Sequence, residues 1–289
     1  METRRNFLKA GCIAIAGATT VGSISLIKPK VTQASSAEHP YGWPIAGIDI
    51  NQTKELGYLG YKGTSRFSSA AGKQCASGVF GAIIGQIQET VANDSENPYH
   101  QIPLGMMQWA ASGVVGFGSL CGALNGACAV IGLVCNENDA KAYISDLLTW
   151  YSESALPIFT SSNSSNNHTK TIAGSNLCHT SVTNWCLASG YASGSNERSE
   201  RCACLSADVA GKVVEMLNSG IGEILGNPRD NKTTCGACHY KGTDYEAGQF
   251  TRGKMNCNSC HVDIKKTSKK GHNSGQHNNH NRSRNGWKK

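Results

Sequence analysis

The sequence predicts a mainly α-helical body followed by a loop-rich C-terminal segment. Apolar residues recur every three or four positions in several stretches up to residue 217, which is the pattern of helices that bury one face. Few stretches alternate between apolar and polar residues, so strand signals are few. Residues 241–254 are polar and contain glycine, and little secondary structure is expected there.

The body contains six stretches with helical spacing or composition. In the first of them, Val79, Ile83 and Ile87 share one helical face. Residues 121–135 are apolar on almost every side and rich in glycine and alanine, which suits a buried, closely packed helix. Residues 160–175 form a polar loop in this prediction. In chain order, the helix-compatible stretches are 74–92, 104–117, 121–135, 139–154, 177–189 and 198–217.

The N-terminus has the features of an export signal. Arg4 and Arg5 precede Phe7 and Leu8, an apolar run follows over 10–27, and small residues then resemble a cleavage site. Paired arginines before a weakly hydrophobic run are typical of a twin-arginine signal. An uncleaved membrane anchor is the alternative, but the run is short and glycine-rich for a span. Residues 1–37 are therefore expected to be removed, which leaves a periplasmic protein without a membrane span.

The charges are distributed unevenly along the chain. The formal net charge is +7, yet residues 38–261 contain 14 basic and 18 acidic residues. Residues 262–289 contain eight basic residues and one acidic residue. Such a basic tail can reach acidic partners, a membrane surface or haem propionates, or it can simply be solvated. No motif for binding phosphate or nucleic acid accompanies it, and no nucleic-acid partner is expected.

Two Cys-x-x-Cys-His motifs lie near the C-terminus. They are Cys235–Cys238–His239 and Cys257–Cys260–His261. In a c-type haem site the two thiols add to the porphyrin vinyl groups and the adjoining histidine binds iron as the proximal ligand. The cysteine spacing also fits a zinc ribbon or two disulfides. A histidine after both pairs, in an exported chain, favours two covalent haems c.

The second axial ligands of the two irons are less determined than the proximal ones. The tail histidines lie close in sequence to the haem motifs and are flanked by glycine, so one of them can fold back onto iron. A solvated, metal-scavenging tail is the alternative. His168 lies in a Ser/Asn-rich stretch and is expected on the surface. The candidates for the distal ligands are His272, His39, His277, His280 and His179.

Eight further cysteines lie in the body, most of them near predicted helix ends. Four thiolates can bind an iron–sulfur cluster, but the same residues can form disulfides or serve as small buried hydrophobic side chains. The twin-arginine route carries proteins that fold before export, often around a cofactor, and this favours a cluster. The eight are Cys75, Cys121, Cys128, Cys135, Cys178, Cys186, Cys202 and Cys204.

The spacing of these cysteines carries a resemblance to a known family. The central element Cys121-Gly-Ala-Leu-Asn-Gly is preceded by a cysteine at 75 and followed by cysteines at 178 and 202. This arrangement resembles the spaced-cysteine redox family with a Cys-Gly-Ala-x-x-Gly element. Together with the two haem motifs and the twin-arginine signal, it makes the chain similar to the split-Soret cytochromes c over residues 39–261.

The resemblance implies a helical homodimer whose haems cluster at one end. Stacked haems with bis-histidine ligation are implied, with the dimer partner implicated in supplying a ligand. An iron–sulfur cluster is implied for the four cysteines that match the family pattern, which are Cys75, Cys121, Cys178 and Cys202. The pattern does not account for all of the other four, and the long tail after His261 departs from it.

The predicted organisation is a signal peptide over 1–37, a helical cysteine-containing body over 38–228, a dihaem segment over 229–270 and a basic His/Asn-rich tail over 271–289. The predicted function is single-electron transfer to redox partner proteins. One alternative is a haem enzyme that reduces a small molecule at an open iron. The other is a zinc- or disulfide-stabilised exported binding protein. No acid/base set for an enzyme is evident in the sequence.

Overall fold

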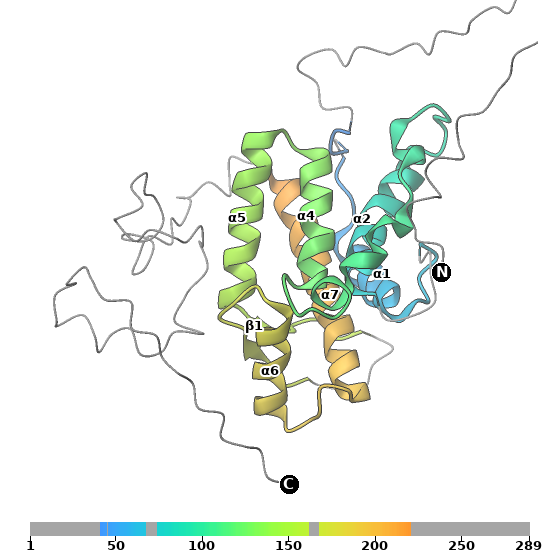
Figure 1. The fold of residues 1–289 in the computed structure, drawn as a ribbon. Helices are drawn as coiled ribbons and strands as arrows, with labels where there is room; N and C mark the ends of the chain where they lie inside the picture. Colours follow the sequence, from blue (N-terminus) through green and yellow to red (C-terminus); the bar gives the residue numbers. More distant parts are fainter. Residues whose placement is uncertain (1–40, 45, 68–73, 162–167, 221–289) are drawn as a thin grey trace, which may run out of the picture. The chain divides into compact units, whose positions relative to one another are not determined.

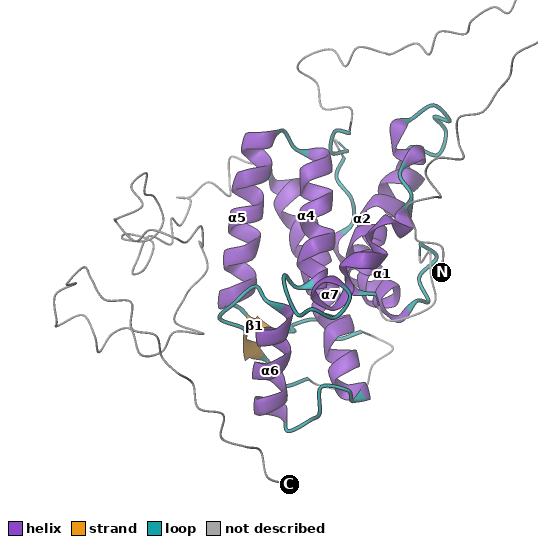
Figure 2. Ribbon diagram, in the orientation of Figure 1, coloured by secondary structure: helices purple, strands orange, loops and turns teal. Residues whose placement is uncertain are grey.

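The computed structural model describes residues 41–44, 46–67, 74–161 and 168–220, and these form a helical body (Figure 1). Its seven α-helices, two 3-10 helices and one two-stranded ribbon confirm the predicted mainly α class (Figure 2). In chain order, the elements are α1 (Ile50–Lys62), α2 (Cys75–Thr90), η2 (Pro98–Gln101), η3 (Leu104–Ala110), α3 (Ala111–Val114), α4 (Gly122–Val134), α5 (Glu137–Glu153), β1 (Ala155–Leu156), β2 (Thr171–Ile172), α6 (Cys178–Ser189) and α7 (Asn196–Ser219).

The long helix α7 organises the core, because α1, α2, α4 and α5 all pack against it. Helices α4 and α5 run side by side in Figure 1, and α2 lies against α4. The buried side chains are mainly aliphatic, as the apolar spacing of α2 and α4 predicts. Antiparallel pairing of β1 with β2 joins Ala155 to Ile172 and Leu156 to Thr171. In the described part of the chain, no helix is long and apolar enough to cross a membrane.

Glycines allow helices of the core to approach closely. A Cβ on Gly126 of α4 would lie 2.3 Å from the Ala76 carbonyl oxygen of α2, and a Cβ on Gly60 of α1 would lie 2.8 Å from the Gly78 Cα. Real Cβ contacts are longer than these distances, so the backbones would have to separate if a larger residue were present. The glycine-rich composition of these helices is therefore a requirement of packing.

The structure differs from the prediction in two segments. Helix α1 was not predicted, because its buried face includes Thr53, Gly57 and Gly60, which give little apolar periodicity. Residues 104–117, predicted as helix-compatible, form a 3-10 helix and then the short α3, inside which Ser112 and Gly113 are left-handed. The left-handed conformation of Ser112 and Gly113 interrupts the predicted helix there.

Candidate metal centre

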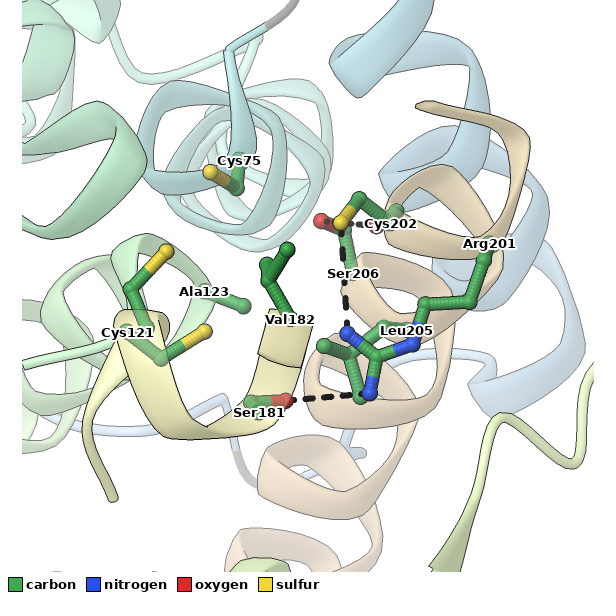
Figure 3. A pocket seen from close by; sticks show the side chains of 10 residues that line it. Cys75, Cys121, Ala123, Ser181, Val182, Arg201, Cys202, Leu205 and Ser206 are labelled. Carbon is green, nitrogen blue, oxygen red and sulfur yellow. Dashed lines mark hydrogen bonds between the residues drawn. The ribbon is translucent and has the colours of Figure 1, made fainter. Parts of the chain in front are cut away.

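Four cysteines from four helices line one small cavity of about 20 Å³. Cys75 is the first residue of α2, Cys121 immediately precedes α4, Cys178 is the first residue of α6, and Cys202 lies in the second turn of α7. Figure 3 shows Cys75, Cys121 and Cys202 around the cavity. The structure therefore brings together the four cysteines that the sequence pattern selected, although 127 positions separate the first of them from the last.

Three of the four helices begin at the cavity, and none of these three has a capping side chain. The N-cap positions of α2, α4 and α6 make no side-chain hydrogen bond to the helix start. In contrast, α1, α5 and α7 are capped by the side chains of Asp49, Asn136 and Ser195. Helix starts carry partial positive charge, although the first two N–H groups of α6 already donate to the carbonyl oxygens of Ser119 and Gly118. The cavity is thus electrostatically suited to an anionic group such as a thiolate-bound cluster.

Burial and neighbouring thiols raise the pKa of Cys75, Cys121 and Cys178 and so favour their neutral form. Burial raises the pKa of Cys75, and the neighbouring Cys121 raises it further. Burial also raises the pKa of Cys178 to about 12, with Cys121 and Cys202 adding to the effect. Because each thiol opposes ionisation of the next, a cation is needed to stabilise several thiolates at once.

Arg201 supplies a fixed positive charge beside the cavity. Its side chain is 1% exposed, its Nη1 atom lies 3.9 Å from the Cys202 Sγ, and its Nη2 atom donates to the Ser181 hydroxyl at 3.0 Å (Figure 3). No carboxylate forms an ion pair with it in the described structure, and its Nε atom has no hydrogen-bond partner. A buried, unpaired guanidinium is costly. The charge is therefore best explained by a negative group in the cavity.

A polar network connects Arg201 through Ser181 to Tyr151 of α5. The Tyr151 hydroxyl donates to the Ser181 hydroxyl oxygen at 3.0 Å, the same atom that accepts from Arg201. Burial raises the pKa of Tyr151 well above its ordinary value, and Cys121 raises it further, so Tyr151 stays protonated and able to donate. Ser181 and Tyr151 thus fix the guanidinium in position.

Small residues and a left-handed turn shape the cavity wall. A Cβ on Gly122 would lie 2.6 Å from the Cys75 Sγ, and a Cβ on Gly113 would lie 2.9 Å from the Cys178 Cβ. Ser112 and Val114 also have positive φ angles of 54° and 64°. Non-glycine residues adopt this conformation at a cost, and such residues cluster at functional sites. The wall is therefore built to hold Cys75 and Cys178 in place.

The spacing of the thiols distinguishes between two kinds of metal site. Within the described chain, no three of the cavity Sγ atoms gather within 4.8 Å of one another. One tetrahedral ion with metal–sulfur bonds of about 2.3 Å would bring its sulfur ligands to about 3.8 Å from one another. A cluster of several irons bridged by sulfide separates its cysteine ligands further. As placed, the four thiols are therefore not gathered tightly enough for a single tetrahedral ion.

The other predicted site residues have different outcomes. All eight body cysteines are free thiols rather than disulfides. Cys128, Cys135, Cys186 and Cys204 do not line the cavity. His179 is exposed on α6, and its role as a distal ligand stays a prediction. The haem-attachment cysteines, the proximal histidines His239 and His261, and the distal candidates His39, His272, His277 and His280 lie outside the described residues.

His168 corrects one expectation. It was expected on the surface, but the structure half-buries it, and its Nε2 atom is buried without a hydrogen-bond partner. The polar residues around His168 predict a loop. They do not indicate that His168 lies against α7, next to Glu200 and Cys204.

Arg201, Ser181 and Tyr151 were not identified from the sequence. A signal for Arg201 was nevertheless present, because it precedes Leu205, Val209 and Val213 at intervals of four and so falls on the apolar face of a predicted helix. A charge on such a face indicates a buried partner.

Comparisons with known proteins agree with the geometry. Residues 74–216 match a family described as "Putative redox-active protein (C_GCAxxG_C_C)". Split-Soret cytochrome c from Desulfovibrio desulfuricans is 29% identical to the chain over 280 residues, which cover 90% of this chain and 94% of that protein.

A solved structure of split-Soret cytochrome c from the same organism, reported with a novel iron centre, is similar with a TM-score of 0.65 and 28% identity. The match covers 76% of this chain and 90% of that chain. The matched family residues begin at Gln74 and include all four cavity cysteines. Residues 74–216 therefore contain the C_GCAxxG_C_C redox-active region, and the chain is a redox protein similar to split-Soret cytochrome c.

Proposed function

We propose that this protein is an exported dihaem c-type cytochrome that transfers single electrons and holds an iron–sulfur cluster as a further redox centre. The cluster would be bound by Cys75, Cys121, Cys178 and Cys202. The haems would be attached at the two Cys-x-x-Cys-His motifs, with His239 and His261 as proximal ligands.

One observation carries the cluster, namely the convergence of four free thiols on a cavity faced by three uncapped helix starts and a buried arginine. Thiolates are the ligands that iron–sulfur clusters require. A cluster bound there would accept and release single electrons. The chain's own contribution is to fix the four sulfur atoms and to stabilise the added negative charge through Arg201 and the backbone N–H groups.

Two observations support the haems. Both attachment motifs have the histidine that a zinc ribbon does not need. The similarity to the Desulfovibrio protein spans 90% of this chain, so it must extend beyond the helical body into the segment that contains the motifs. That relative is named a cytochrome c. The twin-arginine signal fits a protein that acquires a cluster in the cytosol before haem attachment in the periplasm.

The cluster is tested by chemical analysis of the full-length protein, matured with both haems. Iron in excess of haem iron, together with acid-labile sulfide, is expected in the unaltered chain. Replacing Cys75, Cys121, Cys178 or Cys202 by alanine should remove most of both, with the haem content unchanged. Cys128→Ala and Cys186→Ala are matched controls outside the cavity and should retain them. Excess iron without sulfide would contradict a cluster.

The haems are tested by pyridine haemochrome analysis and visible spectra. Two covalent haems per chain are expected, and Cys235→Ala together with Cys238→Ala should lower the count to one while leaving the non-haem iron in place. A split reduced Soret band would support close stacking of the haems. A chain that carries no covalent haem after expression with a maturation system would contradict this part of the proposal and leave the cavity cluster unaffected.

A homodimer is the proposed assembly. Large apolar side chains are exposed within a short stretch, with Phe117 85% exposed, Val115 67% and Trp109 53%. Exposed apolar residues grouped in this way are typical of interaction surfaces. Sedimentation equilibrium of the full chain should give the mass of two chains, and Phe117→Asp should shift it towards one. An unchanged mass for the variant would remove this stretch from the interface.

A further inference from the structure

A second group of metal-ligating side chains lies on another face of α7. The ligand atoms of His168, Glu200 and Cys204 all lie within 4.8 Å of one another. Glu200 and Cys204 are four residues apart on α7 and so project from the same side of the helix. Cys202 is two residues from each of them and projects from nearly the opposite side, since successive helical residues are about 100° apart.

The histidine supplies an independent sign of a missing ligand. Its Nε2 atom is buried and has no hydrogen-bond partner. Burial lowers the pKa of His168, and the nearby Glu200 only partly opposes this effect, so the imidazole is neutral at pH 7. Neutral imidazole is the form that binds metal ions. Buried polar atoms without a partner are few in folded proteins, and each calls for an explanation.

The carboxylate is held in place by side chains from α1. The Tyr58 hydroxyl donates to one oxygen of Glu200, and the Lys62 Nζ donates to the other at 2.6 Å. The Glu200 side chain is 12% exposed. These two bonds fix the orientation of the carboxylate beside His168 and Cys204. Partners of this kind orient metal ligands and are typical of the surroundings of a metal site.

The backbone that follows the histidine is anchored to α6. The Trp185 Nε1 atom donates to the carbonyl oxygen of Thr169, the residue after the histidine, at 3.0 Å. Farther back along the chain, Asp208 of α7 accepts hydrogen bonds from the backbone N–H groups of Ile158 and Phe159 at 2.6 and 2.9 Å. These contacts hold the described residues near the site against α6 and α7.

We propose that His168, Glu200 and Cys204 form a binding site for a zinc ion. One nitrogen, one oxygen and one sulfur ligand is a set that zinc accepts, with water as the fourth ligand. The ligand atoms of a tetrahedral zinc site lie about 3.5 Å apart, so an arrangement within 4.8 Å has to contract by at most about 1.3 Å. A bound cation would stabilise the thiolate form of Cys204. The site does not depend on the cluster or on the haems.

The test uses the full-length, haem-containing protein, stripped with a chelator and dialysed against buffered zinc. We expect one zinc per chain that is lost, with affinity at least 10-fold weaker, in Cys204→Ala, in His168→Ala and in Glu200→Gln. Cys128→Ala and His100→Ala are matched controls and should bind zinc like the unaltered chain. Tyr58→Phe should weaken binding while keeping one zinc at saturation, a result that loss of the fold would not give. Helical circular dichroism verifies that each variant is folded.

Zinc-edge X-ray absorption identifies the ligands without interference from haem. The zinc that disappears in Cys204→Ala should have one sulfur neighbour and nitrogen or oxygen neighbours at about 2.0–2.1 Å. The proposal is overturned if the three ligand variants retain the zinc. It is also overturned if the lost zinc has four sulfur neighbours or if Cys202→Ala, rather than Cys204→Ala, removes it, because the ion would then lie in the cysteine cavity.

Discussion

Removing the charge of Arg201 should make the proposed cluster harder to reduce. Arg201→Met keeps an apolar chain of similar length in the buried position but deletes the guanidinium, whose Nη1 atom is 3.9 Å from the Cys202 Sγ. Adding an iron–sulfur bond of about 2.3 Å places the positive charge roughly 6 Å from the nearest iron. At an effective dielectric constant of about 20, one unit charge at that distance contributes about 3 kcal/mol. Because an added electron gains this stabilisation, the midpoint potential of the variant should fall by about 100 mV.

The potential is measured by redox titration with electron paramagnetic resonance detection, which separates the cluster from the haems. Arg201→Lys is the control, since it keeps the charge but not the guanidinium fork, and its potential should shift by much less. Non-haem iron must be present in both variants for the comparison. A potential unchanged in Arg201→Met, or lowered equally in both variants, would refute the reasoning that the arginine acts through its charge.

Three further predictions concern packing and pH. Gly122→Ala would place a methyl carbon 2.6 Å from the Cys75 Sγ, so the non-haem iron content should fall while haem content stays the same; unchanged iron would show that the wall can yield. Gly126→Ala, which meets a backbone oxygen at 2.3 Å, should lower the free energy of unfolding by about 1–3 kcal/mol. Gly132→Ala, in the same helix with nothing within 4 Å, should raise it by up to about 1 kcal/mol, and denaturant titration of both variants tests whether the close approach is the cause. Burial raises the pKa of Asp208 from 3.8 to about 6 despite its two backbone hydrogen bonds and the nearby Lys54 and Lys170. The folded state then holds the proton more tightly, so stability should decrease as pH rises from about 4 to 6, by at most about 3 kcal/mol, and Asp208→Asn should abolish this decrease in unfolding experiments across that pH range.

The apolar helices were predictable because their buried faces are aliphatic. The spacing of Val79, Ile83 and Ile87 predicts a helix over 74–92. Helix α2 spans Cys75–Thr90, so its two ends differ from the predicted ones by one and two residues. Helix α1 was not predictable in this way, because its contact face contains Thr53 and glycines rather than aliphatic side chains. These glycines allow the backbone of another helix to approach closely. That information depends on the partner helix and is absent from the local sequence.

The cysteines of the site were predictable, but the charged residue beside them was not. The resemblance to the spaced-cysteine family selected Cys75, Cys121, Cys178 and Cys202, and the structure places these four around one cavity. The resemblance did not reveal Arg201, because a single arginine among helical residues is ordinarily solvated. Only the packed structure shows that this side chain is 1% exposed and directed at Cys202.

The arrangement along α7 explains why this helix carries so many chemically active residues. Residues spaced by four lie on one stripe, and neighbouring stripes face different surroundings. The stripe with Glu200, Cys204 and Asp208 faces α1 and the loop that contains His168. The stripe with Cys202 and Ser206 faces the cysteine cavity. A rigid helix can therefore present thiols to two sites from positions only two residues apart. Moving either thiol to the other site would require the helix to rotate by about half a turn, which the packing of α1, α2 and α4 against it opposes.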